Sequence, residues 1–347
     1  MTGKVVVGIT RDKFDKEGKF IFSDEGMKML EGIPGVEVKI FPEYTPEITP
    51  EQIAGMDMVI CGLSKWTSKT IAGNDRLLCI HRCGVGYDMV DVPVMTTANV
   101  MLTITPNAVR RSISMVIMTF ILALSTRLML KQRLAREGRW AEKEQYDGYG
   151  LVGRTLGSIG VGNIGHDMFK LAKPFEMNHI ACDPYIEESA LADVGVKLVD
   201  MDTLLAESDF VTISCPLNKN TRGLVGEKEL RKMKKTAFLI NTARGPIVNE
   251  AALTRALKEG WIQGAAIDVF EQEPTPEDNP LLKMDNIIVT PHALGHLDQT
   301  RTTMIRELVE QISSIMHGII PVLSPNKEVW DKPGFQAKLK KLRLAMK

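Results

Sequence analysis

The sequence has few cysteines, and their spacing excludes two common uses of this residue. Only 5 of the 347 residues are cysteine, an odd number with no C-x-x-C pair. This is neither a disulfide framework nor a zinc pattern, so we expect buried, reduced thiols that pack as small apolar groups. His292 and His296 stand four residues apart, but no acidic cluster accompanies them. The sequence therefore predicts no metal site.

An excess of charge and a long apolar run are also missing. The 43 Lys and Arg residues balance the 43 Asp and Glu residues, which argues against nucleic acid as a partner. The longest apolar run, near Met115–Leu124, is broken by Thr119 and is shorter than the roughly 20 residues that span a bilayer. The N-terminus lacks the features of a signal peptide. We expect a cytoplasmic protein that does not bind membranes.

What the sequence does contain is two series of short apolar runs that alternate with helical patterns. Unalternating runs are typical of parallel strands that are covered on both faces. In the first series we expect helices at Ser23–Glu31 and Pro50–Ala54. The strands are expected at Val5–Ile9, Val36–Ile40, Met58–Cys61, Leu77–Ile80 and Val100–Thr105.

A second series begins at Thr155, after a long helix predicted from about Asn107 to Glu137 that would bridge two domains. Short crossovers between its strands predict a doubly wound sheet. A last helix is expected at about Gln299–His317, and the basic residues from Lys338 onward are expected to be solvated. The six strands are expected at Thr155–Ile159, His179–Cys182, Phe210–Ser214, Ala237–Asn241, Gly264–Val269 and Asn286–Val289.

The second series opens with the motif G-x-G-x-x-G, which follows a strand and begins a helix. Gly160 permits a tight turn, Gly162 lets the backbone approach a pyrophosphate, and Gly165 lets helix and strand pack closely. The helix N-terminus offers free N–H groups to phosphates. Asp183 stands at the end of the next strand, 18 residues after Gly165, where it can bind the ribose hydroxyls and repel a 2′-phosphate. These features predict NAD rather than NADP; an Asp that only caps the following turn is the alternative.

Three charged residues stand near later strand ends of the same sheet, where doubly wound folds bind ligands. Arg244 can hold an anionic substrate and polarise its carbonyl. His292 is a suitable acid and base near neutral pH. Glu273 can orient that histidine and favour its charged form. Each alone would be read as a salt bridge, a capping histidine or a loop carboxylate, but together behind an NAD motif they predict a catalytic set.

Seven motifs in order make the chain resemble the D-isomer-specific 2-hydroxyacid dehydrogenase family. They are REGRW, GRTLGSIGVGNIG, PLNKNTRGLVG, INTARGPIVNEAAL, AAIDVFEQEP, NPLL and TPH. The resemblance implies an α/β protein of two Rossmann-like doubly wound domains. A flavodoxin-like substrate domain would consist of residues 1–106 and 297–330, and an NAD-binding Rossmann domain of residues 107–296, with 331–347 as a tail. It also implies a homodimer built through the nucleotide-binding domain.

The resemblance also implies roles for single residues. It places the family's catalytic Arg, Glu and His on Arg244, Glu273 and His292. Substrate contacts are expected from Val85 and Gly86, and from Trp66 and Arg244. Cofactor contacts are expected from Gly160, Gly162, Asn163, Ile164, Gly165, Asp183, Cys215, Pro216, Thr221, Thr242, Ala243, Asp268 and His292.

The function predicted from these residues is NAD-dependent hydride transfer at C2 of a 2-hydroxy or 2-oxo acid. Ser64 and Trp66 stand where phosphoglycerate-type members carry arginine, which favours a small acid such as glyoxylate or hydroxypyruvate. Three alternatives stay open. They are an NAD(H)-sensing interaction protein that resembles corepressors of this superfamily, phosphoglycerate dehydrogenase activity, and a formate- or phosphite-type oxidant.

Overall fold

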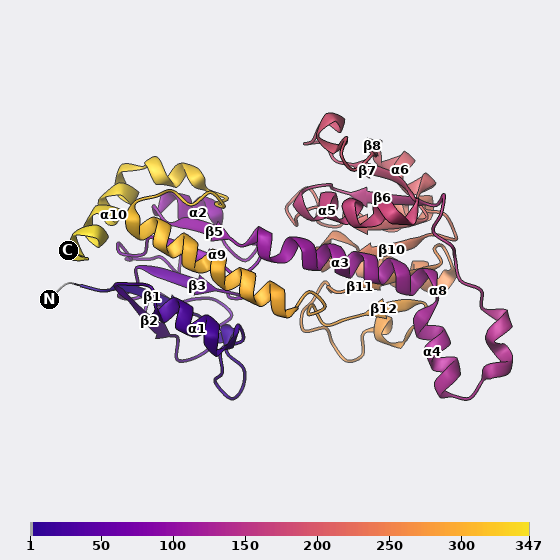
Figure 1. Ribbon diagram of the computed structural model, residues 1–347, viewed down its shortest axis with the longest axis horizontal. Coiled ribbons are helices and arrows are strands. Elements are labelled where there is room, and N and C mark those ends of the chain that lie inside the picture. Colours follow the sequence, from indigo (N-terminus) through magenta and orange to yellow (C-terminus); the bar gives the residue numbers. More distant parts are fainter. Residues whose placement is uncertain (1–2, 347) are drawn as a thin grey trace. The chain divides into compact units, whose positions relative to one another are not determined.

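The computed structural model describes residues 3–346, which divide into two compact units. Within the described residues, unit 1 consists of 3–109 and 297–346, and unit 2 of 110–296. The sequence analysis set the corresponding boundaries at 106 and 297. The chain therefore leaves unit 1, forms all of unit 2 and returns to unit 1 (Figure 1).

Unit 1 contains a five-stranded parallel sheet with the strand order β2-β1-β3-β4-β5. This is the order of flavodoxin-like folds. Nearly every residue of β1, β3, β4 and β5 is buried, as the unalternating apolar runs predicted. The strands are β1 (Val5–Ile9), β2 (Val36–Ile40), β3 (Met58–Cys61), β4 (Cys79–Arg82) and β5 (Met101–Ile104).

Helices and two separate hydrophobic clusters complete unit 1. The helix expected at Pro50–Ala54 is wrong, because these residues form turns. Their hydrogen bonds run from Ala54 N–H to the Glu51 carbonyl and from Met56 N–H to the Ile53 carbonyl, and Gly55 has φ +75. So short a segment makes too few hydrogen bonds to offset helix nucleation. The helices are α1 (Ser23–Glu31), α2 (Val92–Thr97), α9 (Asp298–His317) and α10 (Pro333–Ala345), with 3₁₀ turns η1 (Arg11–Lys13) and η7 (Lys327–Asp331).

The C-terminal segment, expected to be a separate solvated tail, is part of the unit 1 core. Helix α10 buries Phe335, Leu339 and Leu342 in the same cluster as β1 and α9. Lys338 is half-buried and its ammonium donates to the carbonyls of Leu77, Ala98 and Asn99 at 3.0–3.4 Å. Its long apolar stem packs inward while its charge satisfies backbone acceptors, which a count of basic residues does not reveal.

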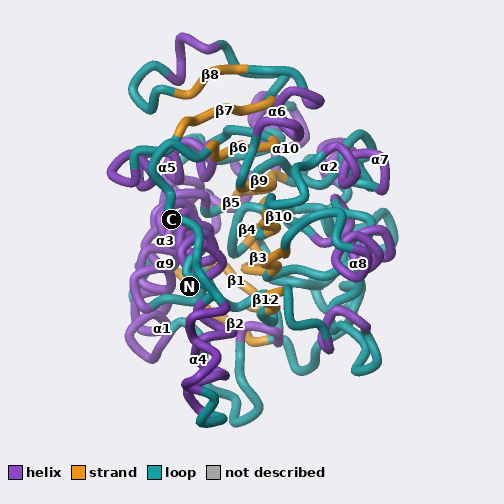
Figure 2. Tube along the Cα trace, turned by 90° about the vertical axis from the view of Figure 1, so that its right-hand side faces the viewer, coloured by secondary structure: helices purple, strands orange, loops and turns teal. Residues whose placement is uncertain are grey.

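Unit 2 contains a seven-stranded parallel sheet with the order β12-β11-β10-β9-β6-β7-β8. Six of these strands are those predicted; β8 was missed. Figure 2 shows β6, β7 and β8 following one another toward one edge of this sheet. The strands are β6 (Thr155–Ile159), β7 (Asn178–Cys182), β8 (Val196–Leu198), β9 (Phe210–Ile213), β10 (Phe238–Asn241), β11 (Gly264–Ile267) and β12 (Ile287–Val289).

The single long helix expected between residues 107 and 137 is wrong. It is two helices, α3 (Pro106–Ser125) and α4 (Leu128–Arg136), separated at Arg127, which has φ 55. The Ser125 carbonyl accepts the Tyr149 N–H at 2.6 Å, and the Arg127 guanidinium donates to the Tyr149 hydroxyl at 2.9 Å. A returning segment thus takes the hydrogen bond that would continue the helix.

Helix α3 is long and apolar enough to cross a membrane by length and composition alone. The apolar run Met115–Leu124 is only the second half of this helix, and the apolar stretch extends further toward its N-terminus. More than half of that stretch is buried inside the protein, which is how a core helix behaves. The remaining helices of unit 2 are α5 (Asn163–Ala172), α6 (Met201–Glu207), α7 (Glu227–Lys232) and α8 (Glu250–Glu259), with 3₁₀ turns η2 (Trp140–Gln145), η3 (Lys173–Phe175), η4 (Glu188–Leu191), η5 (Gly245–Ile247) and η6 (Pro280–Lys283).

Candidate functional site

The glycine loop between β6 and α5 is shaped for close approach of a ligand to the backbone. Gly160 has φ +85, and a Cβ there would lie 2.9 Å from the backbone nitrogen of Cys215. A Cβ at Gly165 would lie 3.2 Å from the Gly160 carbonyl and 3.4 Å from the Ser214 side chain, so this glycine also stands in a tight place. A Cβ at Gly162 would meet nothing within 4 Å, so the space in front of the α5 N-terminus is open. The loop therefore fits a pyrophosphate against helix N–H groups.

Asp183 lies directly after β7 and is tied to this loop. Its Oδ2 accepts the Val161 N–H at 2.9 Å, and its Oδ1 accepts the Tyr185 N–H at 2.9 Å. The carboxylate thus caps its own turn, as the alternative had it, and also contacts the glycine loop. Each carboxylate oxygen has a further lone pair for a hydroxyl donor. The two readings are compatible in this geometry.

The other expected cofactor residues lie at the same carboxyl edge of the unit 2 sheet. Asn163 and Ile164 begin α5, Thr242 and Ala243 follow β10, and Cys215, Pro216 and Thr221 follow β9. The Thr221 hydroxyl donates to the Pro216 carbonyl at 2.6 Å, which closes that loop. Burial raises the pKa of the Cys215 thiol to about 11, so this thiol is protonated at neutral pH and is no nucleophile.

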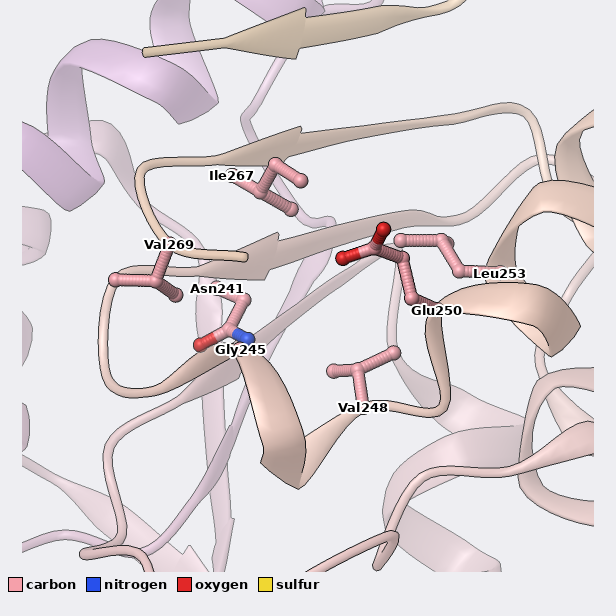
Figure 3. A pocket seen from close by; sticks show the side chains of 7 residues that line it. All are labelled: Asn241, Gly245, Val248, Glu250, Leu253, Ile267 and Val269. Carbon is pink, nitrogen blue, oxygen red and sulfur yellow. The ribbon is translucent and has the colours of Figure 1, made fainter. Parts of the chain in front are cut away.

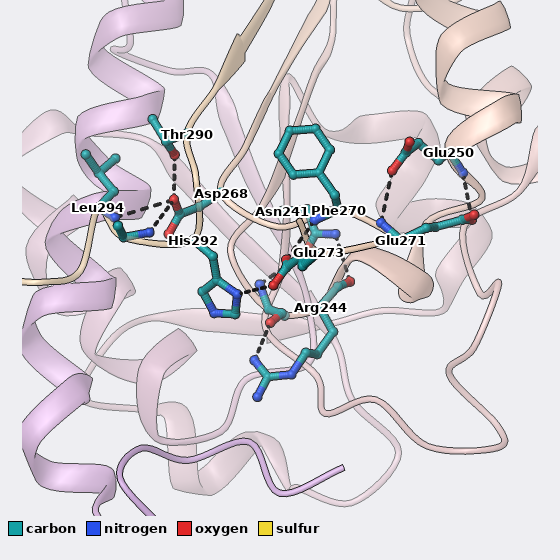
Figure 4. A network of polar contacts seen from close by, with 12 residues as sticks. Asn241, Arg244, Glu250, Asp268, Phe270, Glu271, Glu273, Thr290, His292 and Leu294 are labelled. Atoms are coloured by element: carbon teal, nitrogen blue, oxygen red, sulfur yellow. Dashed lines mark hydrogen bonds and ion pairs between the residues drawn. The ribbon is translucent and has the colours of Figure 1, made fainter. Parts of the chain in front are cut away.

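Glu273 and His292 are in direct contact, from two different loops (Figure 4). The His292 Nδ1 lies 2.6 Å from Oε2 of Glu273, and the Phe270 N–H donates to the other carboxylate oxygen at 2.9 Å. Burial raises the pKa of Glu273, but the bond to His292, its charge, the Phe270 bond and the charge of Arg244 outweigh burial and lower it. Glu273 is therefore ionised at neutral pH and favours an imidazolium beside it.

Arg244 begins the turn that follows β10. Its backbone carbonyl accepts the Asn241 side-chain amide at 3.0 Å, and its Nη1 donates to the Ala243 carbonyl at 2.8 Å. Its charge is close enough to Glu273 to lower the pKa of that carboxyl. The three residues predicted as a catalytic set thus lie at one edge of the unit 2 sheet.

Asp268 is buried at the end of β11 and organises the loop that carries His292. Its Oδ1 accepts the Thr290 hydroxyl at 2.5 Å and the N–H groups of Ala293 and Leu294 at 3.2 and 3.4 Å (Figure 4). His292 has φ 52, a left-handed conformation that costs about 1–2 kcal/mol without such support. The sequence analysis gave Asp268 only a cofactor contact and did not foresee this role.

Two close contacts that the sequence analysis missed join the Arg244 turn to the Glu273 loop. A Cβ at Gly245 would lie 1.9 Å from the carbonyl of Phe270, so only glycine fits there. Glu250 and Glu271 each accept the backbone N–H of the other at 3.0 Å. Beneath them lies a cavity of only about 10 Å³, lined by seven residues (Figure 3). The R-G-P sequence after β10 was the one available signal for this tight approach.

Of the residues expected to contact substrate, Trp66 is buried, whereas Val85 and Gly86 are partly accessible. Val85 and Gly86 follow β4 and are half-buried, in a loop fixed by the Gly84 N–H, which donates to the Thr105 hydroxyl at 2.7 Å. Trp66 is 0% exposed and packs in a hydrophobic cluster of unit 1. The expected substrate contact of Trp66 is therefore wrong, and this residue belongs to the core. Its large apolar ring stabilises the fold when it is removed from water.

No group of three or more His, Cys, Asp or Glu residues within the described part of the chain is arranged to hold a metal ion. His296, the second histidine of the spaced pair, donates its backbone N–H to the Ala293 carbonyl at 2.9 Å and so closes the turn before α9.

Comparison with known proteins gives consistent results. Residues 118–293 match the family model described as the NAD binding domain of D-isomer specific 2-hydroxyacid dehydrogenases. The chain is 39% identical to a glyoxylate reductase of Korarchaeum cryptofilum, over 75% of this chain and 80% of the relative. It is 37% identical to a D-3-phosphoglycerate dehydrogenase of Methanocaldococcus jannaschii, but spans only 56% of that protein's length. The Aquifex aeolicus D-lactate dehydrogenase, solved with NAD and lactic acid, has a TM-score of 0.79 and 25% identity, over 90% of this chain and 96% of that one.

Proposed function

Because the chain belongs to the D-isomer specific 2-hydroxyacid dehydrogenase family, we propose that it reduces a small 2-oxo acid of the glyoxylate or hydroxypyruvate type. It is an NAD-dependent oxidoreductase that acts on CH–OH donors, with an α/β fold of two parallel sheets. The 2.6 Å contact between Glu273 and His292 is the observation that carries the proposal. It supports an acid and base that a carboxylate orients, at the same carboxyl edge of the unit 2 sheet as the glycine loop.

The residues proposed to hold NAD(H) are those at the carboxyl edge of the unit 2 sheet. The N–H groups at the start of α5 would bind the pyrophosphate. Asp183 would bind the adenosine ribose, and Asp268 the nicotinamide amide. When bound, NADH supplies the hydride that C2 of the oxo acid receives.

The proposed chemistry uses three side chains of unit 2. Arg244 would hold the substrate carboxylate and polarise the carbonyl oxygen with its planar fork of donors. His292, donating from Nδ1 to Glu273, would keep Nε2 for the proton that the forming alkoxide takes. Glu273 orients the imidazole and favours its charged form until that proton is given up. The N–H groups of Val85 and Gly86 are proposed to bind the substrate carboxylate.

The substrate class is proposed from two side chains of unit 1 and from the relatives. Ser64 donates to the Thr45 carbonyl at 2.7 Å and Trp66 is in the core, so neither presents a cation to a phosphate. Relatives with 34–39% identity to this chain are named glyoxylate reductase.

Steady-state kinetics with NADH and a panel of 2-oxo acids test the proposal. We expect turnover of glyoxylate or hydroxypyruvate. We expect weak use of the phosphorylated 2-oxo acid that would be reduced to 3-phosphoglycerate. A strong preference for the phosphorylated acid would overturn the substrate class. NADH binding without turnover of any acid in the panel would instead favour the NAD(H)-sensing interaction protein.

We also propose that the protein is a cytoplasmic homodimer built through unit 2. Four large apolar side chains on and after α4 are more than half exposed: Leu128, Met129, Trp140 and Val152. Exposed apolar side chains of this size are typical of interfaces. Sedimentation of Leu128→Glu should show monomers where the wild type forms dimers. Val322→Glu, at a 78% exposed position of unit 1, is the matched control and should stay dimeric.

A further inference from the structure

Glu250 and Glu271 form a reciprocal pair that the proposed chemistry does not use. Glu250 is the first residue of α8, and its N–H donates to Oε1 of Glu271 at 3.0 Å. In return, the Glu271 N–H donates to Oε2 of Glu250 at 3.0 Å (Figure 4). The two adjacent carboxylates repel each other, but both lie at the N-terminus of α8, where the partial positive charge of the helix stabilises negative groups. Each acid thereby fixes the other's backbone.

Glu250 also holds the far end of the loop that Glu271 begins. The buried side-chain amide of Asn279 donates to Oε1 of Glu250 at 2.6 Å and to the Thr275 hydroxyl at 2.8 Å. Its oxygen accepts the Leu281 N–H at 3.0 Å. One carboxylate therefore binds both ends of the segment 271–279. Glu273 lies inside that segment.

Most of this segment is exposed, including Glu271 and Glu273. Apart from the bonds of Glu250, it is held by the Phe270 N–H on Glu273 and by bonds within the segment from Asn279 to Thr275 and Pro276. The cavity between Gly245 and Glu250 is about 10 Å³, which is at the lower limit for one water molecule (Figure 3). The bonds of Glu250 are the ones that join both ends of the segment to the start of α8.

We propose that Glu250 is a positioning residue for the reaction, whose carboxylate clamps both ends of segment 271–279 and so directs Glu273 toward His292. This inference rests on the proposed function. The charged groups of unit 2 around His292 are Glu273, which contacts it, and Arg244, whose charge acts on Glu273. Asp268 binds the backbone of the two residues that follow.

Loss of the clamp has a specific consequence. Without the Glu250 carboxylate the Phe270 N–H still holds one oxygen of Glu273, and the backbone N–H of residue 250 still donates to Glu271. The Glu271 N–H and the Asn279 amide, however, each lose the acceptor that joins the two ends of the segment. The direction of the Glu273 carboxylate toward His292 is then less well fixed. Binding of NADH uses other loops and is unaffected. A shift of about 1 Å at a reacting group costs on the order of 100-fold in rate.

The experiment compares Glu250→Ala and Glu250→Gln with the control Glu229→Ala. Glu229 is a matched residue because, like Glu250, it lies in the first turn of a helix and its carboxylate accepts a backbone N–H, here that of Gly226 at 3.1 Å at the start of α7. The pH dependence of kcat/KM for glyoxylate reduction and the NADH Kd are measured for each. Glu250→Ala is expected to lose about 10–100-fold in kcat, to keep the NADH Kd within twofold, and to move the alkaline fall to lower pH. Glu229→Ala is expected to keep the wild-type profile.

Glu250→Gln keeps one acceptor oxygen and turns an NH₂ group toward the other donor, so we expect a smaller shift in the same direction. It also tests the proposal if Glu250→Ala does not fold. The decisive arm is the double variant with Glu273→Gln. If Glu250 acts through Glu273, adding Glu250→Ala to Glu273→Gln changes the pH profile little further. Additive effects, or a wild-type profile in folded Glu250→Ala, would overturn the proposal.

A readout that needs no turnover separates this inference from the proposed function. The NMR resonance of the His292 Nδ1 proton reports whether the ring still donates to Glu273, whether or not any 2-oxo acid is reduced. We expect this resonance to lose the downfield shift of a short bond to a carboxylate in Glu250→Ala and to keep it in Glu229→Ala. An unchanged resonance in both variants would refute the clamp even if the enzyme is active. Loss of the bond in a protein without turnover would uphold the clamp and reject the function.

Discussion

Replacing Gly245 by alanine tests the contact between the Arg244 turn and the Glu273 loop. The added Cβ would lie 1.9 Å from the carbonyl carbon and oxygen of Phe270 and 2.5 Å from the Glu271 nitrogen. Carbon atoms pack at about 3.5–4.0 Å, so one loop must retreat by roughly 1.5 Å. The obstructing atoms are backbone and cannot rotate away.

The expected size of the effect follows from this displacement. Overpacking of this kind costs about 1–3 kcal/mol, which for a unit of this length lowers Tm by about 2–12 °C. A displacement above 1 Å between Arg244 and Glu273 should reduce kcat by about 100-fold or more. NADH affinity should fall less than kcat, because the glycine loop and Asp183 are not among the atoms that the added Cβ meets, whereas Thr242, Ala243 and Asp268 lie close in the chain to this contact.

Thermal unfolding, an NADH titration and glyoxylate reduction measure the three quantities. Gly150→Ala is the control, since a Cβ there meets nothing within 4 Å and its φ is ordinary. It should match the wild type in all three. A Gly245→Ala protein with wild-type Tm and kcat would show that the two loops are not held in contact, and would refute the reasoning.

Four further predictions concern single side chains. Arg244→Lys should lose most of kcat/KM at nearly unchanged NADH affinity, because an ammonium lacks the planar fork; near wild-type efficiency would contradict this. The wild type should prefer NADH to NADPH by at least about tenfold in kcat/KM, equivalent to ~1.4 kcal/mol, and Asp183→Ala should narrow that ratio. Since the pKa of Glu273 is lowered and its charge favours the protonated His292 that reduction needs, Glu273→Gln should move the alkaline fall in reduction to lower pH; profiles with the same alkaline limb would argue against it. Lys338→Met keeps the stem but leaves three carbonyls without a donor, so Tm should fall by several degrees while kcat is unchanged.

Much of the fold could be predicted because its signals are local. Buried parallel strands are apolar along most of their length, so β1 and β3 could be located to the residue. The G-x-G-x-x-G motif joins one strand to the next helix within a few positions. Strand β8 has three residues, and Lys197 at its centre is exposed, so its sequence carries no comparable signal.

The features that could not be predicted depend on distant parts of the chain. The break between α3 and α4 arises because Tyr149 takes the Ser125 carbonyl, 24 positions earlier. Trp66 belongs to the core because of how residues from several strands pack, whereas the family resemblance had implied a substrate contact. Glu250 meets its partners across 21 and 29 positions, and neither spacing belongs to a motif.

The return of the chain to unit 1 sets an order of events during synthesis. The core of unit 1 includes Leu308 and Ile312 of α9, and the β5 backbone N–H of Leu102 donates to the side chain of Asn326 at 2.8 Å. Residues 297–346 are translated after all of unit 2. A nascent chain can therefore complete the uninterrupted unit 2 first, while the first hundred residues wait with their sheet uncovered on one face. Chaperone demand during translation should fall on that N-terminal part of unit 1.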